Sequence, residues 1–113
     1  MTQQEAIAMA GAVRPHALTE STLVRFLSDL EGSIATRIRR EAVKPSVRTP
    51  VKGEKLTLSV PAPFDRVYWT YLVAMIDLTV GDTKQYAVSK SLFDEAFDAY
   101  ARWYQQTGGN GAR

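Results

Sequence analysis

The sequence reads IDLTVGDTKQY from residue 76 to residue 86, and this stretch predicts the fold of the C-terminal half. Gly81 suits the left-handed position just after a helix, and Asp82 is a favourable N-cap for the helix that follows. Apolar residues recur at helical spacing on both sides, over residues 64–80 and 83–106. Because so short a connection leaves the two helices no room to diverge, we expect an antiparallel αα-hairpin.

The N-terminal half predicts two more helices. Thr2 and Glu5 have the spacing of a capping box, which predicts a first helix over residues 3–13. Thr19 is the next favourable N-cap, and the apolar residues after it predict an amphipathic helix over residues 20–42. Since the first helix is too short to be stable alone, we expect it either to dock on the others or to fray.

Residues 45–63 separate these helices from the C-terminal pair. Four prolines in this stretch exclude a continuous helix. Residues 56–60 alternate apolar and polar side chains, the period of a strand, and we expect them to pair with residues 47–51. The fold class predicted is mainly α: a small helical bundle with one short β-hairpin, about residues 47–60, between its second and third helices.

The length of 113 residues suits a single domain. We expect residues 1–106 to form one helical domain and residues 107–113, which are polar and rich in glycine, to form a flexible tail. No run of about 18 apolar residues occurs, and the chain does not start with a basic, then apolar, leader. We therefore expect neither a secretory signal nor a membrane partner.

The composition argues against most catalytic sites. The chain has no cysteine and one histidine, His16, so thiol nucleophiles and Cys/His zinc sites are excluded or poorly supported. Asp94 and Asp98 share a helix face, with Asp77 on the preceding helix as the nearest further carboxylate. These carboxylates could form an acid/base or metal site, but we favour the interpretation that they form an acidic surface. We expect no enzyme activity, no catalytic residue, no metal and no cofactor.

The net charge of +2 conceals an uneven distribution. Residues 1–36 have a net charge of −2, residues 37–55 of +5, and residues 56–113 of −1. The basic segment suits nucleic acid or an acidic protein surface, although a solvated helix end followed by a polar loop has the same composition. No aromatic residue is interleaved with its arginines, which argues against stacking on bases.

The aromatic residues are also unevenly placed. Ten of the eleven lie between Phe64 and Tyr104, and Phe26 is the exception. Such side chains fill a core, but tryptophan and tyrosine are also enriched at protein interfaces. Both interpretations stay open, and the second concerns Trp69, Trp103 and Tyr104.

A family resemblance is carried by motifs within residues 61–106. They are PAPFD at residues 61–65, YWTYL at 68–72, ID at 76–77 followed by GD at 81–82, Tyr86, and the aromatic helix of residues 93–104 that ends in YARWY. Together they resemble the head–tail connector (adaptor) family of tailed phages and prophages, which are small head-completion or neck proteins. Ala87, Val88 and Asp94 depart from the asparagines usual there, and the first 60 residues match only in layout.

The resemblance implies a structural protein of the virion neck that assembles in the host cytoplasm as a homo-oligomeric ring, a dodecamer. The ring is expected to dock on the portal protein, to meet a tail-completion or stopper protein, and to surround genomic DNA in its lumen. The residues implied in portal binding are Arg102, Trp103, Tyr104, Gln105, Gln106, Thr107 and Arg113. Those implied to face the lumen or a neighbouring ring are Arg37, Arg39, Arg40, Lys44, Arg48, Lys52 and Lys55. Those implied at the subunit interface are Tyr68, Trp69, Leu58 and Val60.

A second hypothesis rests on the basic segment alone. In it the chain is a small nucleic-acid-associated regulator that binds DNA through residues 37–55. Such binding weakens steeply as the salt concentration rises, because it releases counterions from the phosphates.

Overall fold

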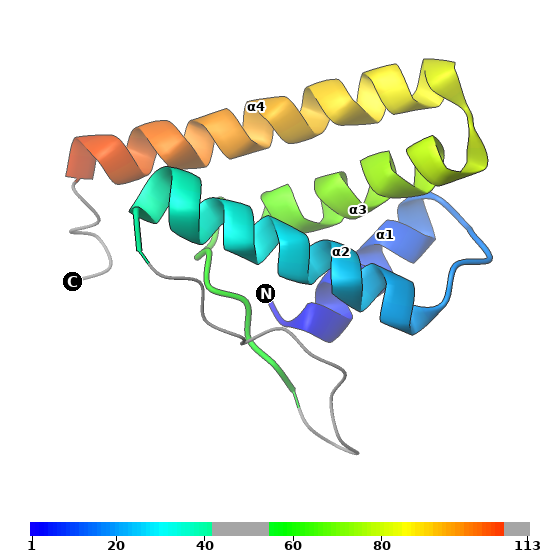
Figure 1. Ribbon diagram of the computed structural model, residues 1–113, viewed down its shortest axis with the longest axis horizontal. Coiled ribbons are helices and arrows are strands. Elements are labelled where there is room, and N and C mark those ends of the chain that lie inside the picture. Colours follow the sequence, from blue (N-terminus) through cyan, green and yellow to red (C-terminus); the bar gives the residue numbers. More distant parts are fainter. Residues whose placement is uncertain (42–54, 108–113) are drawn as a thin grey trace.

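The computed structural model describes residues 1–41 and 55–107. Within them the chain forms α1 (Gln3–Val13), α2 (Glu20–Ser33), its π-helical continuation η1 (Ile34–Arg39), α3 (Arg66–Val80) and α4 (Thr83–Thr107). Figure 1 shows α3 in the middle, with α4 along one side and α1 and α2 on the other. The mainly α prediction is confirmed, and α3 is the helix on which the others pack. No helix in this part of the chain is long and apolar enough to span a bilayer.

Local caps fix the first two helix starts at the expected residues. Thr2 Oγ1 accepts a hydrogen bond from the Glu5 N–H (3.1 Å), and Glu5 Oε1 accepts one from the Thr2 N–H (2.7 Å). Thr19 Oγ1 accepts from the Thr22 N–H (3.3 Å). Each bond satisfies an N–H that has no partner inside the helix, so neighbouring residues alone determine where these helices begin.

The connection between α3 and α4 is as short as expected. Gly81 has a φ of 80°, which is unfavourable for a residue with a Cβ. Asp82 Oδ1 then accepts a hydrogen bond from the Gln85 N–H (3.0 Å) and caps α4. The two helices pack along each other, and the predicted αα-hairpin is confirmed.

One apolar core holds the bundle together. The first helix docks rather than frays, since Ala6 and Ala10 are fully buried against the other helices. The largest fully buried side chains are the two tyrosines Tyr68 and Tyr100. A wholly buried tyrosine needs a partner for its hydroxyl, and both have one.

The end of the second helix differs from the expected residue 42. Its last turns are π-helical, and Arg40 takes the left-handed conformation with a φ of 55°. The Ala35 carbonyl accepts hydrogen bonds from the N–H groups of Arg40 and Glu41 (2.9 Å for the second). A left-handed residue cannot continue a right-handed helix, so the helix ends at Arg39.

The predicted β-hairpin is not seen in the described part of the chain, and residues 47–51 lie outside it. Thr57 instead forms an antiparallel bridge with Thr2, at the N-terminus. Two backbone hydrogen bonds flank it: the Gln3 N–H donates to the Leu56 carbonyl (2.7 Å), and the Leu58 N–H donates to the Met1 carbonyl (3.0 Å). Within the described residues this segment therefore forms a single bridge to the N-terminus and not a strand of a hairpin.

Alternation along this segment matches the expected period of two. Leu58 and Val60 are buried in the core, whereas Thr57 and Ser59 are exposed. One face of the segment therefore packs against the helices, as a half-buried strand does.

A buried ion pair joins three of the helices. Asp77 of α3 is fully buried, and its carboxylate accepts hydrogen bonds from Arg14 Nε (2.7 Å), which follows α1, and from Ser89 Oγ (2.8 Å) of α4. Arg14 is 31% exposed. These contacts fix the C-terminal end of α1 and the first half of α4 to α3 through one carboxylate.

Candidate docking surface

The π-helical turn η1 presents arginines at the end of the second helix. Ile34 and Ile38 anchor the turn in the core, while Arg37 and Arg40 are exposed and Arg39 is half-buried. A π-helical turn inserts an extra residue into a helix, and such turns are frequent at functional sites. From this turn Arg37 and Arg39 contact Phe97 and Tyr100 in the C-terminal half of α4, which lies alongside in Figure 1.

Arg39 is held in place by a bonded network. Its Nε and Nη2 donate hydrogen bonds to the Tyr100 hydroxyl (3.0 and 2.8 Å), and Nη2 also donates to the Ser59 carbonyl (3.0 Å). Its guanidinium carbon lies 5.7 Å from the centroid of the Tyr100 ring. The guanidinium carbon of Arg37 likewise lies 5.1 Å from the centroid of the Phe97 ring. Both distances are within the range of cation–π attraction.

A second network fixes the backbone that Arg39 binds. The Tyr68 hydroxyl donates to Glu31 Oε1 (2.6 Å) and accepts from the Val60 N–H (2.9 Å). The Ser59 N–H and hydroxyl donate to the same carboxylate (3.1 and 3.0 Å). Burial, together with the charge of Glu31, raises the pKa of Tyr68 well above its usual range, so this hydroxyl stays protonated and donates.

Four aromatic rings cluster at the end of α4. Trp103 lies with its centroid 5.1 Å from Phe64 and 5.8 Å from Tyr100, and Tyr104 lies 6.0 Å from Tyr100. Contacts at these separations stabilise aromatic clusters beyond the area that they bury. Trp103 and Tyr104 are only half-buried, so part of each ring faces outward.

A hollow of about 440 Å³ lies between this cluster and η1. Arg39, Trp103 and Tyr104 contribute to its wall, and Pro61 and Ala62 line it from the segment before α3. We name four residues the Arg–aromatic surface: Arg37, Arg39, Trp103 and Tyr104. Their side chains come from two helices that are distant in sequence and fixed to each other by the Arg39–Tyr100 contact.

The residues implied in portal binding lie in different environments. Trp103 and Tyr104 belong to the Arg–aromatic surface. Three other side chains in the last turns of α4 are exposed: Arg102, Gln105 and Gln106. Thr107, expected to begin the tail, still belongs to α4, and its hydroxyl donates to the Trp103 carbonyl (2.9 Å). Arg113 lies outside the described residues.

Only some of the residues implied to face the lumen or a neighbouring ring lie close to one another. Arg37, Arg39 and Arg40 lie on or beside η1, whereas Lys55 is exposed near Glu5, whose pKa it helps to lower after the larger effect of the Thr2 hydrogen bonds. The other three lie outside the described residues: Lys44, Arg48 and Lys52.

The implied subunit interface is wrong for three of its four residues. Tyr68, Leu58 and Val60 are buried in the core of this chain and have no surface left for a neighbour. The alternating pattern shows that these side chains need cover, and the helices of the same chain provide it. Of the four, only Trp69 stays half-exposed, and it lines a cavity other than the hollow.

The three carboxylates considered as a catalytic or metal set do not converge. Asp77 is buried against Arg14 and Ser89, and the exposed Asp94 binds Lys90 Nζ (2.6 Å), one turn away. Asp98 likewise faces Arg102 (3.4 Å). In residues 1–41 and 55–107, no group of three or more histidine or acidic side chains could hold a metal ion.

The aromatic partners of the arginines could not be found by reading along the sequence. Phe97 and Tyr100 lie about sixty residues after the arginines that they contact. The only signal was the aromatic spacing along the last helix, which does not reveal the helix opposite it. Comparison of the chain with protein-family models, curated proteins and solved structures found no match.

Proposed function

We propose that this protein is a head–tail connector (adaptor) subunit of a tailed phage, which binds the portal protein through the Arg–aromatic surface. The observation that carries the proposal is the convergence of Arg39, Trp103 and Tyr104 around one hollow at the end of α4. The resemblance in residues 61–106 implies portal binding for Trp103 and Tyr104, and the position of Arg39 beside them adds it to the proposed surface. Arginine, tryptophan and tyrosine are also the residue types that contribute most to protein–protein binding energy.

Two properties of the surface support a protein partner. Its side chains are already positioned by hydrogen bonds and ring contacts, so little conformational entropy is lost when a partner binds. Arg37, Arg39 and Arg40 form no ion pair among the described residues, although Glu41 also lines the hollow and Glu31 lies near Arg39; three cations against these two carboxylates favour an acidic partner. The partner proposed is therefore a protein with an acidic, groove-filling segment.

The proposed assembly is a ring of twelve subunits in the virion neck, formed in the host cytoplasm. It joins the portal to a tail-completion or stopper protein, with genomic DNA in its lumen. In this role the subunit performs no reaction, and its sites are interfaces.

The direct experiment is co-purification with the cognate portal protein, followed by electron microscopy of the complex. Trp103→Ala and Arg37→Glu should each weaken portal binding at least tenfold. The matched charge reversal Arg25→Glu, at an exposed side chain of α2, should change it less than twofold. Circular dichroism confirms that each variant is folded. A wild-type protein that neither binds the portal nor forms a ring on it would refute the proposal.

One observation favours the second candidate, a nucleic-acid-binding regulator. Arg37 lies against Phe97 and Arg39 against Tyr100, so aromatic rings do accompany the arginines in space. If this function holds, the free protein binds duplex DNA with an affinity that falls with salt by a logarithmic slope of about −0.9 per phosphate contacted. Arg37→Ala and Arg40→Ala should each make that slope shallower by the contribution of about one phosphate contact. If the protein has no affinity for DNA at low salt, this candidate function is excluded.

A further inference from the structure

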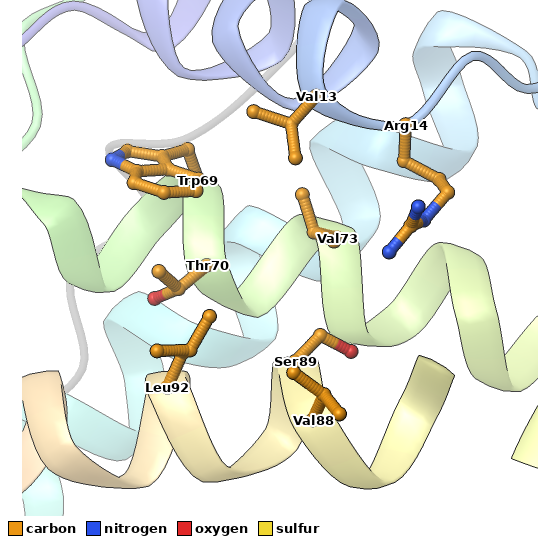
Figure 2. Close-up of a pocket in the computed structure, with 8 residues that line it drawn as sticks. All are labelled: Val13, Arg14, Trp69, Thr70, Val73, Val88, Ser89 and Leu92. Carbon is orange, nitrogen blue, oxygen red and sulfur yellow. The ribbon is translucent and has the colours of Figure 1, made fainter. Parts of the chain in front are cut away.

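A groove along α3, lined by other residues than the hollow, is left open by residues 1–41 and 55–107. α1 and α4 both pack against α3, but within the described chain the backbones of α1 and α4 stay apart. The gap between them holds a cavity of about 70 Å³ with Thr70 and Val73 of α3 at its floor. Figure 2 shows Val13 and Trp69 at one wall and Leu92 at the other.

Most side chains that line this groove are apolar, and Arg14, Thr70 and Ser89 are the exceptions. Val13 is 43% exposed, and on the facing helix Val88 is 64% and Leu92 47% exposed. Met9 is also exposed, one turn before Val13 on the same face of α1. Contiguous exposed apolar side chains on a small protein mark an interaction surface. The gap between α1 and α4 would accept one further amphipathic helix, lying along α3 with its apolar face on the groove.

The chain itself carries a helix that fits this position. On α4, Val88 and Leu92 form an exposed apolar stripe four residues apart, and Lys84 and Glu95 continue the same helix face on either side of it. We consider two copies of α4 that pack antiparallel about a two-fold axis near residue 90. In this arrangement the stripe of Val88 and Leu92 in one copy packs against the same stripe in the other. The same arrangement brings Lys84 of each copy to Glu95 of the other, whereas parallel packing brings like charges together.

Both charged residues are available for such a contact. Lys84 has no carboxylate within ion-pair distance in residues 1–41 and 55–107. In the described part of the chain, Glu95 has only Arg66 within ion-pair distance, at 3.7 Å, and both of those side chains are largely exposed. Solvent-exposed pairs of this kind contribute little to stability and are readily exchanged for others.

We propose that a second copy of this chain covers the groove. Its α4 lies antiparallel to α4 of the first copy and beside α1, and the two copies form a two-fold symmetric dimer of the free protein. The inference does not depend on the proposed portal binding, because it uses a different face of the bundle.

A cysteine cross-link tests the geometry directly, because the chain has no cysteine of its own. Ser91 is exposed next to the proposed axis, and Ser28 is exposed on α2, outside the groove. Under mild oxidation, Ser91→Cys should form a disulfide-linked dimer at least tenfold faster than Ser28→Cys. Equal rates for the two variants would overturn the proposed arrangement.

Charge reversal tests the specific pairing. By sedimentation equilibrium, Lys84→Glu and Glu95→Lys should each raise the dimer dissociation constant at least tenfold, and the double variant should restore it to within about threefold. A double variant no better than the single variants overturns the antiparallel register. A wild-type protein that remains monomeric at high concentration overturns the dimer itself, whether or not the portal binds.

Discussion

Arg39 and Tyr100 lie 61 residues apart in the chain, and two hydrogen bonds of 3.0 and 2.8 Å join them. The same guanidinium donates to the Ser59 carbonyl. One side chain therefore connects the π-helical turn, the segment before α3 and the end of α4. The hollow beside Trp103 exists because these three segments are held at fixed positions.

Removal of the Tyr100 hydroxyl should loosen this connection without leaving a gap in the core. Tyr100→Phe keeps the buried ring and deletes the acceptor of both bonds from Arg39. Because Arg39 is partly exposed and can bind water instead, we expect the free energy of unfolding to fall by about 1–2 kcal/mol. Urea denaturation measures this. Tyr104→Phe is the control, since that hydroxyl makes no hydrogen bond within the described residues, and an equal loss there would contradict the assigned role.

The two partners of the buried ion pair should respond unequally to truncation. Arg14→Ala leaves the buried carboxylate of Asp77 without its cation and, among the described residues, with only Ser89 as a side-chain donor, so we expect a loss of about 3–5 kcal/mol. Asp77→Ala leaves a guanidinium that is 31% exposed and reaches water, so its cost should be smaller, about 1–3 kcal/mol.

Urea denaturation of both variants decides the order. Arg25→Ala is the control, because its contact with Asp29 spans 4.0 Å between exposed side chains and should contribute less than about 0.5 kcal/mol. An equal or reversed order for Arg14→Ala and Asp77→Ala would mean that burial of Asp77 does not determine the cost.

The helix ends that the sequence predicted correctly are those with a local cause. Thr2 and Glu5 cap each other, and Gly81 takes the left-handed conformation that ends α3. Each signal lies within four residues of its effect. The end of the second helix was missed because Arg40 takes a left-handed conformation that is unusual for a residue with a side chain.

The features that could not be predicted depend on which segments meet in space. The alternation in residues 56–60 shows that one face is buried, but it does not say that the bridge partner is Thr2. Nor does the aromatic spacing of the last helix say that Phe97 lies against Arg37. The candidate surface is therefore visible in the sequence only as two separate clusters, one basic and one aromatic.

Stability should decrease at alkaline pH because of Tyr68. Burial and the neighbouring Glu31 raise the pKa of this phenol above its ordinary value of 10.0, so the folded chain keeps a proton that the unfolded chain loses. The contribution is complete below the unfolded pKa, and as the pH rises through it the free energy of unfolding decreases.

Urea denaturation from about pH 8 to about pH 11 measures this slope. In Tyr68→Phe the slope should be shallower but not absent, because burial also raises the pKa of Tyr71 and of Tyr100. Identical slopes in the wild type and the variant would show that Tyr68 does not cause the alkaline loss.

The extended segment before α3 should be sensitive to truncation at every second residue. Leu58 is 4% exposed and packs in the core, whereas the side chain of the adjacent Thr57 is exposed. Leu58→Ala removes buried methyl groups and leaves a cavity, so we expect the free energy of unfolding to fall by about 2–5 kcal/mol. Thr57→Ala keeps the backbone bridge to Thr2 and should cost less than about 0.5 kcal/mol. Thermal or urea denaturation distinguishes the two, and similar losses at both positions would mean that the backbone pairing, rather than the buried face, holds the segment on the bundle.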